Sequence, residues 1–62
     1  MATYTTQHSD DPNNVLNQVL SHLSSFGVTL LAAQKNTDNF TIMLAQPLDA
    51  DQVEHLGLTE VA

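Results

Sequence analysis

The chain has 62 residues, a length that leaves room for one domain with a single hydrophobic core. Hydrophobic residues make up 42% of the sequence and charged residues only 13%, which argues against both a charged disordered tail and a membrane protein. One basic residue, Lys35, stands against seven acidic residues, and the net charge is -6. Phosphate backbones and anionic membranes require several basic side chains, so we expect neither as a partner. A charged partner would be basic.

The absence of cysteine removes disulfides, thiolate nucleophiles and cysteine-based zinc sites. A domain of this size then depends on packing alone or on oligomerisation, and we expect a homodimer. Residues 1–7 lack the basic and apolar regions of a signal peptide, and the longest apolar run, 30–33, is too short to span a membrane. We therefore expect a cytoplasmic protein.

The first predicted helix covers residues 12–26. Asp11 stands at the N-cap position and Pro12 at the first helical position, where its missing N–H costs nothing. Gly27 fits the left-handed position that ends a helix, and Val28 fits the apolar position that follows. Apolar residues recur at helical spacing and predict one buried side, formed by Val15, Leu16, Val19, Leu20, Leu23 and Phe26.

Two β-prone stretches, 28–33 and 40–45, flank a polar run at 35–39 and predict a β-hairpin. A four-residue turn at 36–39 places Ala33 opposite Ile42 and Leu31 opposite Leu44, on the face that packs on the helix. A slip of one residue would exchange Leu30 for Leu31 on the other face. That other face is too apolar for an ordinary solvated sheet surface, and it carries Leu30, Ala32, Gln34, Thr41, Met43 and Ala45.

A second, shorter helix is predicted over residues 50–56, with Asp49 as its N-cap and Gly57 at its end. Residues 3–6 are β-prone and predict a strand beside the hairpin, although residues 1–8 as a whole are expected to be frayed or to form an edge strand. The last four residues are expected to be frayed or weakly extended. The fold class is therefore α+β: one small domain over 1–62, in β-α-β-β-α order, with an antiparallel sheet packed on one amphipathic helix. As an analogy of fold only, this order is that of a ferredoxin-like split βαβ unit without its last strand.

Residues that could carry chemistry are few. His8, His22 and His55 show no zinc-binding spacing, and Asp51, one helical turn before His55, is interpreted as a loose surface partner of that ring. The serines lack a nucleophile motif, and the paired carboxylates stand at helix starts, where capping explains them. The sequence therefore predicts no enzyme, no cofactor and no metal site.

Two functional interpretations stay open. The first is a small acidic module that binds another protein and inhibits or modulates it, in the manner of phage or mobile-element accessory inhibitors. The second is a structural or regulatory subunit that acts through its own oligomer or a larger assembly. In the first, an apolar sheet patch and acidic residues contact the partner. The expected binding residues are Leu30, Ala32, Met43, Ala45, Asp38, Asp49, Asp51 and Glu54.

Overall fold

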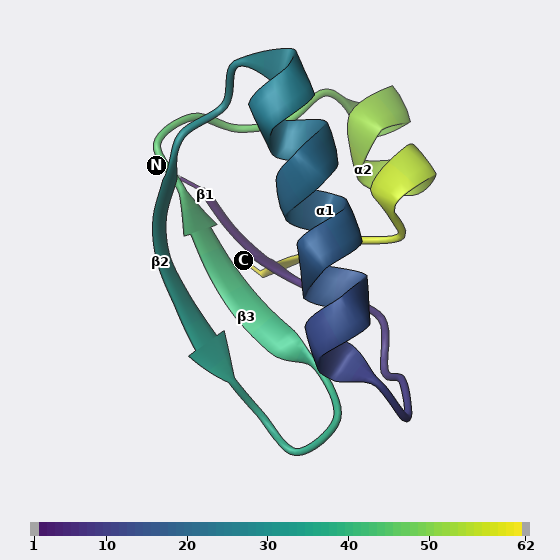
Figure 1. Ribbon diagram of the computed structural model, residues 1–62. Helices are drawn as coiled ribbons and strands as arrows, with labels where there is room; N and C mark the ends of the chain where they lie inside the picture. Colours follow the sequence, from purple (N-terminus) through teal and green to yellow (C-terminus); the bar gives the residue numbers. More distant parts are fainter. Residues whose placement is uncertain (1, 62) are drawn as a thin grey trace.

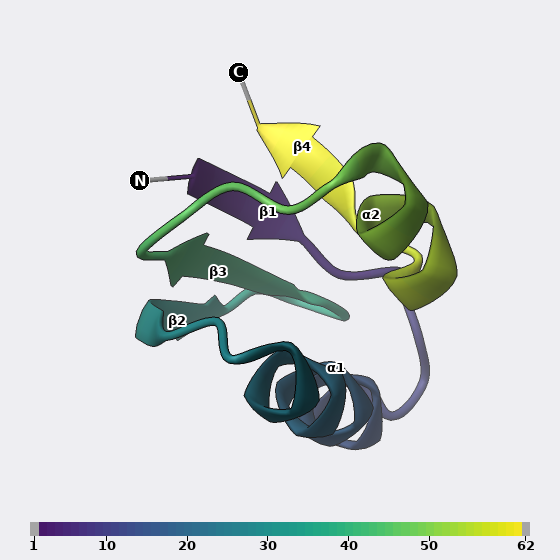
Figure 2. The same ribbon diagram turned by 90° about the horizontal axis from the view of Figure 1, so that it is seen from above.

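The computed structural model describes residues 2–61, so residues 1 and 62, the ends of the expected domain, lie outside the described part. The elements in chain order are β1 (Ala2–Thr5), α1 (Pro12–Phe26), β2 (Leu30–Lys35), β3 (Phe40–Leu44), α2 (Ala50–Leu56) and β4 (Thr59–Val61). The strands form one antiparallel sheet in the order β2-β3-β1-β4. Both helices lie on the same side of this sheet (Figures 1 and 2). The predicted α+β class is confirmed.

The two ends of the chain are more ordered than the sequence indicates. Strand β1 lies inside the sheet, where Tyr4 pairs with Ile42 of β3 and with Glu60 of β4. The last residues, expected to be frayed or weakly extended, form β4 against β1. This strand completes the arrangement that the predicted order left unfinished, because a ferredoxin-like unit has the order β-α-β-β-α-β.

Both helices begin and end where capping chemistry places them. The Asp11 side chain accepts a hydrogen bond from the Asn14 N–H at 3.2 Å, which satisfies one of the free donors at the start of α1. At its end, Gly27 adopts a φ of 74°, and the Val28 N–H donates to the Leu23 carbonyl at 3.0 Å. This Schellman arrangement turns the chain back toward the sheet.

Helix α2 repeats the same design on a smaller scale. The Gln52 side chain accepts a hydrogen bond from the Asp49 N–H at 3.0 Å, as expected for a capping box. Gly57 ends the helix with a φ of 66°, and the Leu58 N–H donates to the Val53 carbonyl at 3.0 Å. Leu58 is then buried, so the end of α2 fixes the start of β4.

The hydrophobic core lies between the sheet and the helices. Strand β3 supplies its centre, because its residues alternate between buried and half-buried positions. Helix α1 adds Val19 and Leu23, whereas Phe26, expected in the buried stripe, is 38% exposed and stacks on His22. The buried hydrophobic residues are Tyr4, Val19, Leu23, Phe40, Ile42, Leu44, Leu48 and Leu58. Within residues 2–61, neither helix has the length and apolar character needed to cross a membrane.

A β-bulge in β2 changes which leucine faces the core. Near the turn the register is the predicted one, with Ala33 opposite Ile42. Further along the strand the register shifts, and Leu30 instead of Leu31 lies opposite Leu44. A bulge inserts one extra residue and re-aims the side chains on one side of it. Leu30 is therefore half-buried against the core, not on the opposite face as expected, and Leu31 is 53% exposed.

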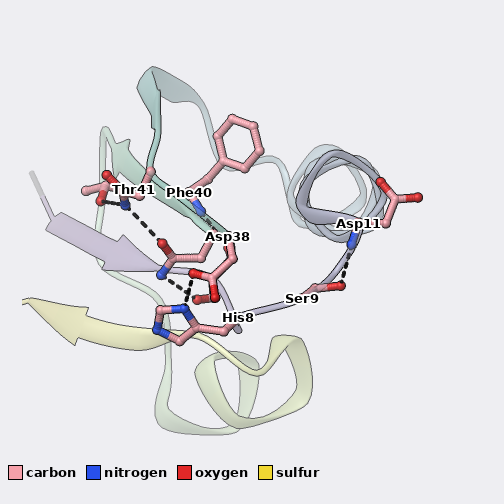
Figure 3. Close-up of polar contacts among 9 residues, drawn as sticks. His8, Ser9, Asp11, Asp38, Phe40 and Thr41 are labelled. Atoms are coloured by element: carbon pink, nitrogen blue, oxygen red, sulfur yellow. Dashed lines mark hydrogen bonds and ion pairs between the residues drawn. The ribbon is translucent and has the colours of Figure 1, made fainter.

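Buried polar contacts join the segment after β1 to the hairpin turn (Figure 3). The Thr6 N–H donates to the Phe40 carbonyl at 2.8 Å, and the Thr6 hydroxyl accepts from the Phe40 N–H at 2.9 Å. The Asn39 side-chain amide donates to the Thr6 carbonyl at 3.1 Å. Because Thr6 and Asn39 are both buried, these bonds satisfy groups that water cannot reach.

Strand β1 is also joined to the segment before α2 by the Tyr4 hydroxyl, which accepts a hydrogen bond from the Leu48 N–H at 2.9 Å. We expect Tyr4→Phe to lower the free energy of unfolding by about 1–3 kcal/mol, because it leaves a buried N–H without an acceptor. Urea denaturation followed by circular dichroism measures this difference. Equal stability of the variant and the wild type would show that this bond does not hold the fold together.

A second prediction tests the bulge. Leu30→Ala should lower the free energy of unfolding by about 1–2 kcal/mol, because Leu30 is half-buried and loses only part of a full core contact. Leu31→Ala should change it by no more than about 0.5 kcal/mol, because its side chain is largely in water. The same denaturation experiment compares the two variants directly. A larger loss from Leu31→Ala would mean that the uninterrupted register applies in solution.

Candidate functional site

The face of the sheet turned away from the helices, the outer face, is open (Figure 2). Its residues follow from the pairing, since partners across neighbouring strands share a face and alternate along each strand. They are Thr3, Thr5, Ala32, Gln34, Thr41, Met43, Thr59 and Val61. The outer face, so defined within residues 2–61, carries no charged side chain.

A shallow hollow of about 110 Å³ lies on the outer face where β1, β3 and β2 meet. Two of the expected binding residues, Ala32 and Met43, line it together with Thr3, Gln34 and Thr41. Ala45 lies just beyond β3, where its N–H donates to the Thr29 carbonyl at 3.0 Å. Of the four apolar residues expected to bind a partner, the structure therefore brings two together, Ala32 and Met43, and turns Leu30 toward the core.

The acidic residues expected beside this patch lie elsewhere. Asp49, Asp51 and Glu54 belong to the start and body of α2, on the side of the sheet that the helices cover. Asp38 is in the hairpin turn, where its carboxylate contacts the His8 ring (Figure 3). Both side chains of that contact are more than half exposed, so it adds little to stability. The structure thus separates the acidic residues from the outer face instead of bringing the two together.

Glu60 and Lys35 complete this separation of charge. Glu60 pairs with Tyr4, and Lys35 pairs with Phe40; both partners are buried under the helices. Since paired residues share a face, both charges point away from the outer face. The remaining carboxylates, Asp10 and Asp11, precede α1.

A cleft of about 240 Å³ lies between α1 and α2. His22 of α1 and His55 of α2 line it, with their ring centres 5.2 Å apart and the rings at 86° to each other. Glu54, Gln7 and Gln18 also contribute to its walls. These two histidines belong to different helices, and only the packing of the helices brings them together. The spacing of His22 and His55 in the sequence does not predict that they meet.

The described residues therefore offer two candidate sites, one on each side of the sheet. The outer face is uncharged and has one shallow hollow, which suits contact with a protein surface. The cleft between the helices is polar, contains two histidines and is smaller than most small-molecule pockets, which suits an ion more than an organic ligand. The chain has no significant match among protein-family models, curated proteins or solved structures.

Proposed function

We propose that this protein is an acidic protein–protein interaction module: two copies pair through the outer face, and the pair binds and modulates a basic partner protein. The observation that carries this proposal is the separation of charge. A chain with a net charge of -6 keeps its acidic side chains off the outer face defined above. A solvated sheet face normally carries polar and charged side chains; here five of the eight residues are threonine or glutamine, three are apolar and none is charged. Pairing of two copies would account for the missing charges.

A second copy is the occupant that this face suits best. Two chains of like charge repel each other, and the repulsion is least where no carboxylate enters the contact. A stable interface takes about 800 Å² from each partner, which is about a fifth of the 3944 Å² surface of this chain. That area requires the whole sheet face, not the hollow at Met43 alone. Pairing also buries Ala32, Met43 and Val61, which adds apolar contacts to a domain whose single core is small.

The acidic side of the molecule then remains available to a partner. Asp49, Asp51 and Glu54 are exposed on and beside α2, away from the outer face. In a pair of chains their field is doubled, and a negative surface accelerates and orients the approach of a basic protein. The pair would inhibit or modulate its partner by covering a basic surface, in the manner of a phage or mobile-element accessory inhibitor.

A structural or regulatory subunit is the second candidate function, and the uncharged outer face favours it as well. In that case the oligomer is itself the functional unit, and the acidic residues only keep it in solution. Salt distinguishes the two cases. Binding of a basic partner weakens as ionic strength rises, whereas pairing through the uncharged outer face does not.

The pairing is tested with Met43→Glu, which adds a charge to the centre of the outer face. We expect light scattering to give a molar mass of twice 6.7 kDa for the wild type at both low and high salt. The variant should remain folded and have the mass of a single chain, because each pair would bury two unpaired carboxylates. Asn17→Glu, on the exposed side of α1, is the matched control and should stay paired. A monomeric wild type, or pairing that survives Met43→Glu, would contradict the assignment.

The acidic surface is tested by removing two charges from α2. Asp51→Asn combined with Glu54→Gln keeps the size of both side chains, and Asp10→Asn combined with Glu60→Gln removes the same charge elsewhere. Tagged proteins are used to capture partners from cells that produce the protein. We expect a basic protein to be retained by the wild type and the control, to be lost from the α2 variant, and to elute at about 0.5 M salt. Capture that is equal for both variants and resistant to salt would rule out the acidic surface.

A further inference from the structure

The cleft between α1 and α2 contains the only two described histidines that contact each other. His22 and His55 come from different helices, and their ring centres are 5.2 Å apart. Both side chains are exposed, and among the hydrogen bonds of residues 2–61 none involves either ring. Their ring nitrogens are therefore open to a ligand. His8, by contrast, is already in contact with Asp38.

The spacing of the two rings matches that of two imidazoles on one metal ion. A nitrogen ligand lies about 2.0–2.1 Å from a zinc ion, which puts each ring centre about 3.2 Å from the metal. At a tetrahedral angle, two such rings have their centres about 5 Å apart. The observed distance of 5.2 Å agrees with this value. The rings lie edge to face at 86°, so a shared ion requires the side chains to rotate, which their exposure allows.

We propose that His22 and His55 together bind a divalent late transition-metal ion, of the class of Zn²⁺ and Cu²⁺. Neutral imidazole suits these ions, whereas Mg²⁺ and Ca²⁺ prefer oxygen ligands. Within residues 2–61 no group of three or more histidine and carboxylate side chains is gathered around one point. Water therefore fills the other positions on the metal, as in an open site. The acidity of the chain raises the local concentration of cations at the cleft.

Metal binding at this cleft would join the two helices. Helix α2 contributes no fully buried residue, and its half-buried Val53 and Leu56 are its main contacts with the core. An ion held by one ligand from each helix would link α2 to α1, which is anchored by buried Val19 and Leu23. Because the ion binds the folded state and the two ligands are far apart in an unfolded chain, it should also raise the unfolding temperature.

Calorimetric titration with Zn²⁺, supported by thermal unfolding, tests the proposal. We expect one Zn²⁺ per chain, no binding of Mg²⁺, and a rise in unfolding temperature with Zn²⁺. The single variants His22→Ala and His55→Ala should bind Zn²⁺ about a hundredfold more weakly. Each leaves one imidazole on the ion and removes the second, which in the wild type is held close by the fold. His8→Ala is the matched control and should bind as the wild type does. Equal affinity in all three variants, or no binding by the wild type, would overturn the proposal.

A second measurement needs no variant and so is independent of any effect of substitution on folding. Small amounts of paramagnetic Cu²⁺ broaden the NMR signals of the rings that bind it. We expect the ring signals of His22 and His55 to broaden together and before that of His8. Broadening of His8 first, or of the three rings in parallel, would place the metal elsewhere. Neither result depends on a protein partner, so the metal site and the interaction module succeed or fail separately.

Discussion

The hydrogen bond from the Leu48 N–H to the Tyr4 hydroxyl ties the centre of the sheet to the segment that leads into α2. Tyr4 has no exposed surface, and its strand pairs on both sides, with β3 and with β4. The first strand is therefore the element that both halves of the chain share. At its far end, Thr6 closes the sheet against the hairpin turn through buried hydrogen bonds. Since α1 and α2 both lie on one side of β1, no helix within residues 2–61 covers the other side (Figure 2).

Local chemistry was enough to predict much of this fold. Asp11 and Gly27 mark the ends of α1, and Asp49 and Gly57 mark those of α2, so the helix bounds found in the structure agree with those predicted. Caps work through contacts a few residues apart, which a sequence displays directly. The hairpin register near the turn follows for the same reason. Strand β4 was missed because three residues carry little pattern, and its stability comes from pairing with β1.

The candidate sites depend on contacts between segments that are far apart in the chain, and the sequence predicts these less well. Alternation along β3 placed Met43 on the outer face, but the bulge turned Leu30 inward, and a single inserted residue leaves no mark in an apolar run such as 30–33. The acidic residues were expected beside the patch, although most of them start helices or turns. Their local roles place them at the ends and on the covered side of the sheet. His22 and His55 meet only through helix packing, which no spacing in the sequence encodes.

The uncharged outer face and the acidic side that carries the helices would have complementary roles in a pair of chains. If the outer faces of two copies meet, the uncharged residues are buried. The carboxylates of α2 then lie on the far side of each copy, away from the interface, where the two sets repel each other least. The cleft between α1 and α2 lies on the same outward side, so pairing leaves His22 and His55 accessible. The negative field that would attract a basic protein also attracts a metal cation to this cleft. A metal ion at α2 would then reduce the negative charge next to Glu54, so occupancy of the cleft and binding of a basic partner would oppose each other.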